Sequence, residues 1–254
     1  MDNPELLSLT TCFYPPMPGS QPFPADKTTP RLFGLLALAL IGLALVPTVW
    51  PELDLAVAQW FAPPDGYVDA KSWWWVRGIN LYIPAIFRCL VFVAIGLWIV
   101  ATKSAAWRAW RLPLAFFILS GALGPGLVVN AGFKEHWQRA RPYEVVNFGG
   151  TEQFTRGGLI TDQCDNNCSF VSGHVACGFF FASLMLVQRR RQRYWAVVGC
   201  AAGGAIAFAR MADMAHWLSD TLWAAPITWV CSWLVWRALV WAYEAADKPS
   251  RMVG

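Results

Sequence analysis

The chain of 254 residues is 56% hydrophobic and 15% aromatic, but only 14% charged. Soluble domains carry about 25% charged residues, so this composition favours a membrane protein and excludes a disordered chain, a collagen-like chain and a small disulfide scaffold. The 16 Trp agree with this, since Trp favours membrane–water interfaces. The net charge of +4 comes from scattered basic residues, whereas a nucleic-acid-binding protein gathers them in one patch. We expect an integral membrane protein with no nucleic-acid partner.

Six apolar segments are candidates for membrane-spanning helices, which need about 20 mainly apolar residues. In chain order they are residues 32–51, 81–101, 112–133, 171–188, 194–209 and 217–241. The second contains Arg88, which either snorkels outward or faces the bundle. Between the first two, residues 72–80 include three consecutive Trp and predict an interfacial helix on the outer side. The sequence thus predicts an all-α fold, a bundle of six transmembrane helices.

The chain shows no internal repeat and no linker that would divide it. Residues 1–30 hold seven of the 17 Pro, which predicts a flexible tail. This tail lacks the basic start and prompt apolar core of a secretory signal. We therefore expect one membrane domain over residues 31–244, with a second short tail at residues 245–254.

Basic residues collect in the connections and tails on one side of the predicted bundle. They are Lys27, Arg31, Lys103, Arg108, Arg111, Arg189, Arg190, Arg191, Arg193, Lys248 and Arg251. Because positively charged loops stay in the cytoplasm, we expect both termini there. The opposite loop, residues 134–165, holds four basic and five acidic residues.

Polar and ionisable residues near membrane depth are candidates for function, because placing them there is costly. In this chain they lie at the ends of predicted spans or in the loop of residues 134–165. They are Lys134, Arg141, Pro142, Ser172, Gly173, His174, Arg210, His216 and Asp220. The charge bias of the loops places all of them at the outer side, so segments far apart in sequence are expected to converge there.

The residue types in this set suit the binding of a phosphate group. Lys134, Arg141 and Arg210 supply three cations for the several oxygens of a phosphate. Ser172 and Gly173 begin the fourth predicted span, and backbone N–H groups at a helix N-terminus attract anions.

Two histidines of the set suit phosphoryl transfer. His216 and Asp220 are four residues apart and share a helix face, so the carboxylate can orient the imidazole as a nucleophile or base. His174, on another helix, can protonate a leaving oxygen. Together, these residue types suit phosphoryl transfer without a cofactor.

The same residues resemble the three-part signature of the type-2 phosphatidic acid phosphatase family. The three parts are Lys134-x6-Arg141-Pro142, Ser172-Gly173-His174 and Arg210-x5-His216-x3-Asp220. Their order and spacing match the family, and the resemblance covers about residues 133–220. It implies a family member from the membrane-bound branch, with six spans around the motifs.

The resemblance also implies a role for each matching residue. His216 is expected to form a phosphohistidine, Asp220 to orient it, and His174 to act as the general acid. The residues expected to bind phosphate oxygens are Lys134, Arg141, Arg210, Ser172 and Gly173. Two positions depart from the family pattern, with Val171 in place of Pro and Ala209 in place of Ser. Neither does the chemistry, although the missing Ser is expected to remove one phosphate hydrogen bond.

Other polar residues near the motifs leave alternatives open. His136 is expected to face lipid headgroups and is a candidate substrate contact. Arg139 either contacts a second phosphate or faces solvent. Cys164 and Cys168 either form a disulfide in an oxidising compartment or stay free thiols. A three-His metal site is disfavoured because the nearby cations would repel a metal ion, so we expect no metal and no cofactor.

The resemblance implies a lipid phosphate as substrate, met in the bilayer at the periplasmic face of a bacterial inner membrane, and no obligate protein partner is evident. Residues 147–150 and 164–174 resemble most closely the lipid A phosphatase-like branch. The alternatives are undecaprenyl pyrophosphate, phosphatidylglycerol phosphate and phosphatidic acid. A second hypothesis is a phosphotransferase that passes phosphate from undecaprenyl pyrophosphate to lipid A. A third, a non-catalytic lipid transporter, is disfavoured because the ionisable residues crowd at one end of the bundle.

Overall fold

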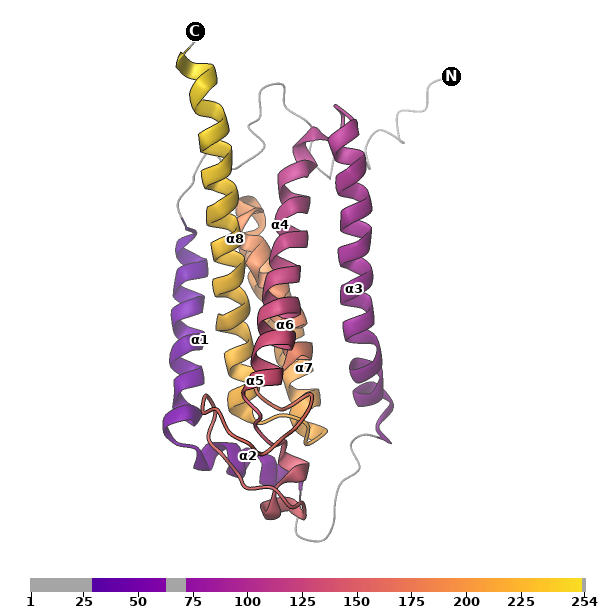
Figure 1. The fold of residues 1–254 in the computed structure, drawn as a ribbon, viewed down its shortest axis with the longest axis vertical. Coiled ribbons are helices and arrows are strands. Elements are labelled where there is room, and N and C mark those ends of the chain that lie inside the picture. The colour runs from indigo at the N-terminus through magenta and orange to yellow at the C-terminus, as the bar shows by residue number, and fades with distance from the viewer. Residues whose placement is uncertain (1–28, 63–71, 253–254) are drawn as a thin grey trace.

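The computed structural model describes residues 29–62 and 72–252, which fold as a bundle of helices (Figure 1). Its elements, with η for 3-10 and π segments, are α1 (Arg31–Val49), α2 (Glu52–Phe61), α3 (Trp74–Lys103), η3 (Arg108–Trp110), α4 (Arg111–Gly121), η4 (Ala122–Phe133), α5 (Lys134–His136), η5 (Pro142–Glu144), η6 (Val146–Phe148), α6 (Gly173–Phe180), η7 (Phe181–Leu186), η8 (Arg189–Arg191), α7 (Gln192–Ala212) and α8 (Leu218–Met252). Within the described residues there is no strand, only one β-bridge between Val145 and Glu152. The predicted all-α fold is confirmed.

Each of the six predicted spans coincides with helical structure. Four helical stretches of the described residues are long and apolar enough to cross a membrane. They are Arg31–Val49, Trp74–Lys103, Arg108–His136 and Arg189–Ala212. The helical segment Gly173–Leu186 is shorter, and α8, although 35 residues long, is not among the four.

The predicted interfacial helix at residues 72–80 is not a separate element. Trp74 begins α3, which continues without a break to Lys103. The Trp75 ring stacks on Phe208 of α7, with ring centroids 6.1 Å apart, so the start of α3 packs against the bundle. On the same helix the Arg88 side chain is exposed.

A short helix that the sequence analysis did not predict follows the first span. This helix, α2, has two acidic residues in its first turn and lies across one end of the bundle (Figure 1). It contacts α8 and α7. Asp54 and Ala58 on its inner face are buried, while Glu52 is exposed. An acidic side chain is thereby directed into the end of the bundle.

Helix α8 is at the centre of the packing, in contact with α1, α4, η4 and α6, and α6 lies against both α7 and α8. Trp229 and Trp236 of α8 are fully buried in this core. The indole of Trp229 donates to the carbonyl of Phe179 on α6 at 2.8 Å, which satisfies its buried N–H. Large apolar side chains such as Leu38 on α1 and Phe92 on α3 are exposed, as on helices that face lipid.

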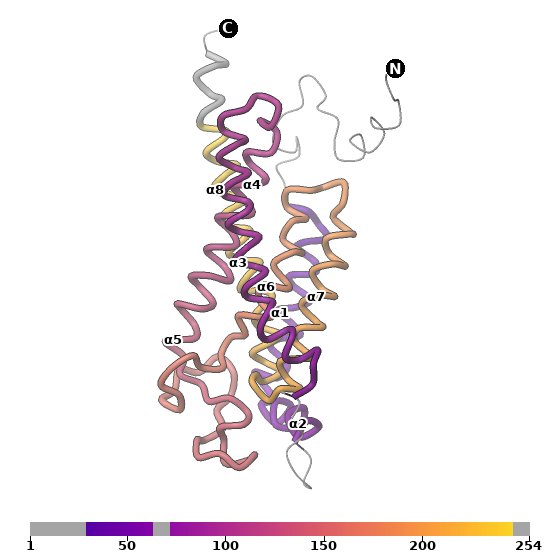
Figure 2. Tube along the Cα trace, turned by 90° about the vertical axis from the view of Figure 1, so that its right-hand side faces the viewer, coloured from indigo at the N-terminus to yellow at the C-terminus, as the bar shows by residue number. Residues whose placement is uncertain are grey.

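Both ends of the bundle have a distinct character. The loop of residues 137–172 and α2 gather at one end, while the α3–α4 connection, η8 and the end of α8 lie at the other (Figures 1 and 2). Residues 1–28 of the expected N-terminal tail lie outside the described residues. Helix α8 runs on to Met252, so most of the expected C-terminal tail, residues 245–254, extends this helix.

Candidate active site

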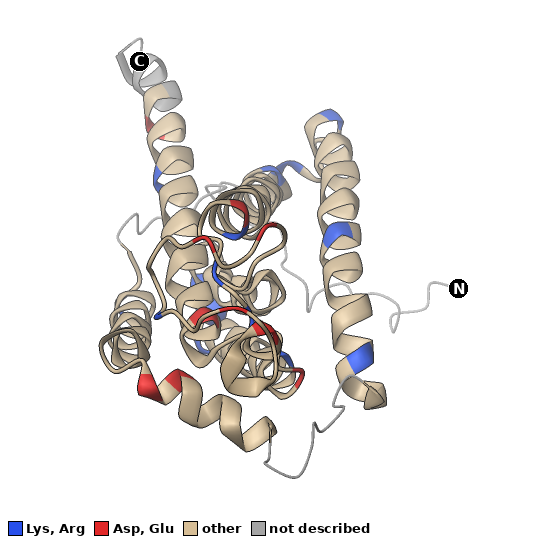
Figure 3. Cartoon of the chain, turned by 60° about the horizontal axis from the view of Figure 1, so that its bottom comes forward, with Lys and Arg blue, Asp and Glu red and all other residues tan. Residues whose placement is uncertain are grey.

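The motif residues lie at the end of the bundle that the loop of residues 137–172 covers (Figure 2). By element they are Lys134 in α5, Arg141 in the loop, Ser172, Gly173 and His174 at the start of α6, Arg210 in the last turn of α7, and His216 and Asp220 around the start of α8. Figure 3, with this end forward, shows charged residues of both signs beneath the loop. The structure therefore brings together the residues that the sequence analysis predicted.

A hydrogen bond from one ring nitrogen fixes the side chain of His216, and the other ring nitrogen has no partner among the described residues. Its side chain is buried, and Nδ1 lies 2.8 Å from the carbonyl oxygen of Ser169. Because a carbonyl only accepts hydrogen bonds, Nδ1 carries the proton and Nε2 carries the lone pair. Nε2 is buried and finds no hydrogen-bond partner among the described residues. The ring thus presents an unshared electron pair to the interior of the site.

The electrostatic surroundings keep this imidazole neutral. Burial lowers the pKa of His216 well below its usual range, and the positive charges of Arg210, Arg141 and Lys134 lower it further. A neutral ring is the form in which Nε2 is nucleophilic.

Asp220 holds His216 less directly than the family resemblance implies. Its Oδ2 lies 3.7 Å from Nδ1 of His216, which is too long for a hydrogen bond. The same oxygen accepts hydrogen bonds from the Ser169 hydroxyl and, at 2.9 Å, from the backbone N–H of Trp217. The carboxylate therefore fixes Ser169, and the Ser169 carbonyl in turn orients the imidazole.

Two of the three cations contact one residue of the covering loop. The Lys134 ammonium donates to Oδ1 of Asn167 at 2.6 Å, and Nη2 of Arg141 donates to the Asn167 carbonyl at 2.5 Å. Both cationic side chains are buried, with 7% and 9% of their surface exposed. The oxygens of Asn167 thus occupy donors that a phosphate would need.

The third cation, Arg210, has hydrogen-bond partners of its own. Its Nη1 donates to Oδ2 of Asp213 at 2.8 Å and to the side chain of Asn80 on α3. The amide of Asn80 also donates to Asp213 at 2.8 Å. Nε of Arg210 is buried and has no partner among the described residues. One donor of this guanidinium is therefore left for a ligand.

The start of α6 supplies polar groups from the second motif. Ser172 is the N-cap of α6, and its buried hydroxyl has no partner in the described part of the chain. His174 lies 3.0 Å, through Nε2, from the carbonyl oxygen of Asn80, so Nε2 carries a proton and is held by this carbonyl. A Cβ at Gly173 would collide with the Asn130 side chain, and this close approach requires glycine.

Arg139 does not face solvent, and a contact with a substrate stays a prediction. Its side chain is fully buried. Nη2 donates to Asp54 at 2.8 Å, and Nη1 donates to Ser219 at 2.8 Å and to Asp220 at 2.5 Å. Nε donates to the carbonyl of Thr155 at 2.9 Å. The guanidinium nitrogens donate their hydrogen bonds within the protein, because two buried carboxylates, those of Asp54 and Asp220, flank this side chain.

The remaining predictions near the motifs have different outcomes. Cys164 and Cys168 form the predicted disulfide, with their Cα atoms 5.7 Å apart. His136 is exposed on α5 and its Nδ1 donates to the carbonyl of Gly132 at 2.8 Å, so a substrate contact stays a prediction. Within the described residues, no group of three or more His, Cys, Asp or Glu is arranged to hold a metal ion.

The sequence analysis missed several polar residues of the site, among them Asp54, Asn80, Asn167, Ser169 and Asp213. Asp213 follows Arg210 by three residues on a helix, and this spacing is a signal for an ion pair. Asn167 lies between the two disulfide cysteines. Nothing in the local sequence marks Asp54 or Asn80, because their partners are 85 and 130 residues away.

Four candidate membrane spans, with a buried cluster of cations around a histidine at one end of the bundle, define the chain as a helical membrane protein. Residues 110–244 match the PAP2 superfamily, and the chain belongs to this superfamily. No solved structure matches the chain.

Three relatives carry the name Lipid A 4'-phosphatase. The protein from Francisella tularensis subsp. novicida (strain U112) is 31% identical over 204 residues, a match that covers 75% of this chain and 88% of the relative. The protein from Rhizobium leguminosarum is 37% identical over 134 residues, which cover 52% of this chain and 55% of the relative. The protein from Rhizobium etli is 38% identical over 119 residues, which cover 46% and 45% of the two chains.

Proposed function

We propose that this protein is a membrane lipid phosphatase that removes a phosphate from the headgroup of lipid A. The observation that carries the proposal is a set of three buried polar atoms without partners among the described residues. They are Nε2 of His216, Oγ of Ser172 and Nε of Arg210. Buried polar groups are normally paired, and one bound phosphate would offer a phosphorus atom to the first and oxygens to the other two.

The chemistry follows from the tautomer of His216. Its Nε2 lone pair attacks the phosphorus atom, the ester P–O bond breaks, and His174 in its imidazolium form gives its Nδ1 proton to the leaving sugar oxygen, while the Nε2 proton of His174 stays hydrogen-bonded to the Asn80 carbonyl. His174 then takes a proton from water, whose oxygen attacks phosphorus, and the P–N bond breaks to release inorganic phosphate. Lys134, Arg141 and Arg210 stabilise the negative charge of the phosphoryl oxygens.

The choice of lipid A rests on the relatives. All three carry that name, and the chain covers 88% of the Francisella protein. Its matches with the two Rhizobium proteins cover about half of each. A lipid headgroup also agrees with the position of the site at one end of a bundle with four candidate membrane spans.

We further propose that residues 31–244 form one domain with six membrane spans. These are the four candidate spans together with α6–η7 and α8. The bundle lies in a bacterial inner membrane with both termini in the cytoplasm and the site facing the periplasm. This orientation is supported by the basic residues of the α3–α4 connection and of η8, which lie at the opposite end from the site. The lipid substrate and the bilayer are the proposed partners, and no cofactor or metal is expected.

The first experiment measures phosphate release by the purified protein in detergent from lipid A, undecaprenyl pyrophosphate, phosphatidylglycerol phosphate and phosphatidic acid. We expect selective release from lipid A, unchanged by a chelator. His216→Ala should release no phosphate, while keeping its unfolding temperature within a few degrees of wild type.

Full activity in this variant contradicts the role of His216 as the nucleophile. Loss of activity with a chelator, restored by a divalent metal ion, contradicts the metal-free mechanism. Comparable release from all four lipids contradicts the selectivity. Phosphoenzyme without release points to a phosphotransferase instead.

A further inference from the structure

Asp54 is a buried carboxylate outside the three motifs. Its Oδ1 accepts the backbone N–H of Ser219 at 2.8 Å, and its Oδ2 accepts the Ser219 hydroxyl at 2.6 Å and Nη2 of Arg139 at 2.8 Å. All three hydrogen bonds are donated to the carboxyl group, which is the pattern of an ionised carboxylate. Ser219 lies in the first turn of α8, beside Asp220. Asp54 thus fastens α2 to the helix turn that carries the active-site acid.

Arg139 continues the contact from Asp54 into the active site. Its Nη1 reaches Oδ1 of Asp220 at 2.5 Å, and its guanidinium carbon lies 5.3 Å from the ring centroid of Trp217. Oδ2 of Asp220 accepts the Ser169 hydroxyl. The two oxygens of the Asp220 carboxylate are therefore held from opposite sides, one by the guanidinium and one by the hydroxyl.

Ser169 completes the chain of contacts to the nucleophile. Its hydroxyl binds Asp220, and its carbonyl oxygen accepts the Nδ1 proton of His216 at 2.8 Å. A continuous series of hydrogen bonds thus runs from α2 to the imidazole through residues that are at most 2% exposed.

Fold stability alone does not account for this arrangement. Removing ions from water is costly, and a buried ion pair is often no more stabilising than apolar residues of similar size. Precise orientation of a reacting group, in contrast, contributes directly to rate. When the bond from Nε2 to phosphorus forms, the imidazole gains positive charge. The Ser169 carbonyl and the Asp220 carboxylate, 3.7 Å from Nδ1, are placed to stabilise that charge.

We propose that Asp54, acting through Arg139, is a positioning residue for His216. The Asp54–Arg139 pair holds Asp220 and Ser169 so that the imidazole keeps the Nδ1–H tautomer and directs Nε2 at the phosphorus atom. This inference rests on the proposed phosphatase function.

The test compares Asp54→Asn with Glu52→Gln in the purified full-length protein. Both substitutions remove one negative charge from α2 with little change of shape, but Glu52 is exposed and lies outside the network. At equal concentrations of protein and lipid A, the first turnover of phosphate release is measured as a rate constant and an amplitude, and KM is measured in the steady state. For Asp54→Asn we expect a rate constant about 10- to 100-fold lower, with full amplitude and a KM within about twofold of wild type. Glu52→Gln should match wild type in all three quantities.

Amplitude and rate constant separate positioning from a structural role. A substitution that only lowers the folded fraction reduces the amplitude and leaves the rate constant of the surviving molecules unchanged. That result, or wild-type behaviour of Asp54→Asn, overturns the inference and leaves the phosphatase function intact. Absence of phosphate release from wild-type protein with any lipid overturns the proposed function instead.

A second variant keeps the inference testable if Asp54→Asn does not fold. Ser169→Ala removes only the hydroxyl that binds Asp220, and leaves the carbonyl and the Asp54–Arg139 pair in place. We expect its rate constant to fall about fivefold, the equivalent of one hydrogen bond. Where Asp54→Asn folds, the loss in the double variant should be smaller than the product of the two single losses, because both substitutions act on the same carboxylate. An unchanged rate constant in Ser169→Ala, or fully independent effects, overturns the relay.

Discussion

At the scale of single residues, one backbone carbonyl decides which nitrogen of His216 is reactive. The motif spacing places His216 and Asp220 on one helix face, and a carboxylate at that position is expected to bind Nδ1 directly. In the structure the Ser169 carbonyl takes the Nδ1 proton, and Asp220 binds the Ser169 hydroxyl. The reactive tautomer is the same in both cases, but the residue that enforces it is different.

The lowered pKa of His216 has a consequence for stability. In the unfolded chain this histidine takes up a proton as the pH falls below about 6.5, whereas burial and the nearby cations keep the folded ring neutral. The unfolded state then binds more protons, so stability is lost as the pH falls from about 6.5 toward the lower folded-state pKa, by up to about 1.4 kcal/mol per pH unit. The unfolding temperature of wild type should drop more steeply between pH 7 and pH 5 than that of His216→Gln. Parallel curves for the two proteins contradict the lowered pKa.

At the scale of elements, the disulfide-closed segment of residues 164–168 contacts Lys134 and Arg141, two of the cations proposed to bind phosphate. Asn167 adopts φ of 50°, a left-handed conformation that Gly and Asn tolerate best. Its two oxygens accept hydrogen bonds from Lys134 and Arg141. A phosphate must displace these contacts to reach the same donors.

Two substitutions of Asn167 should therefore change KM in opposite directions. Asn167→Gly keeps the backbone conformation and removes the side-chain acceptor of Lys134, so KM for the lipid should fall about fivefold, the equivalent of one hydrogen bond. Asn167→Asp keeps the shape and adds a negative charge that competes with phosphate, so KM should rise about tenfold. Steady-state rates over a range of lipid concentration measure both. A rise of KM in both variants would mean that Asn167 assists binding instead.

The contact between α6 and α7 depends on small residues, as is common where membrane helices approach closely. A Cβ at Gly203 would lie 2.5 Å from the ring of Phe179, while a Cβ at the neighbouring Gly204 would meet nothing within 4 Å. Gly203→Ala should lower the free energy of unfolding by about 1–3 kcal/mol. Gly204→Ala, the matched control, should leave it unchanged or raise it by up to about 1 kcal/mol. Unfolding in detergent measures both, and equal effects would show that the two helices are not in close contact.

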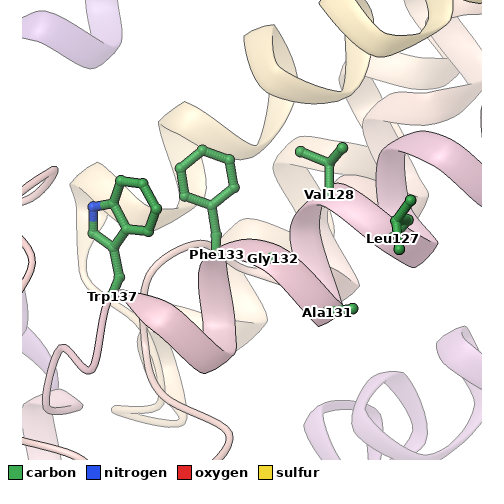
Figure 4. A pocket seen from close by; sticks show the side chains of 6 residues that line it. All are labelled: Leu127, Val128, Ala131, Gly132, Phe133 and Trp137. Atoms are coloured by element: carbon green, nitrogen blue, oxygen red, sulfur yellow. The ribbon is translucent and has the colours of Figure 1, made fainter.

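At the scale of the whole molecule, the two ends of the bundle differ in charge and in content. The active-site residues, α2 and the loop of residues 137–172 lie at one end, and the basic α3–α4 connection and η8 lie at the other (Figure 1). The apolar groove lined by Leu127, Val128 and Trp137 runs along the third candidate span towards the site end (Figure 4). The molecule is thus polarised along the direction expected to cross the membrane.

This polarity predicts the orientation in the membrane. A fluorescent protein that folds only in the cytoplasm should be bright when fused after Gly254, and alkaline phosphatase, which is active only in the periplasm, should be inactive at the same position. Alkaline phosphatase inserted after Gly150, in the loop over the site, should be active. The reverse pattern would place the site in the cytoplasm and contradict the proposed access to lipid A.

The sequence by itself determined the class of protein and the residues of the proposed site. Three motifs at their proper spacing pointed to His216, His174 and the three cations, because phosphoryl transfer needs those residue types and little else can replace them. Apolar segments separated by charged connections located the helices, since a run of apolar residues is a local property of the chain. The short spacing of Cys164 and Cys168 was enough to suggest their pairing.

Only the tertiary structure decided what surrounds those groups. Asp54 enters the site from a short helix that the sequence analysis did not predict, and with it Arg139 forms a buried link to Asp220. The Trp-rich segment predicted as a separate interfacial helix forms the start of α3 instead, because Trp75 packs on Phe208 of α7. Buried polar groups choose partners by proximity in space, and that proximity arises from the packing of helices whose residues are far apart in sequence.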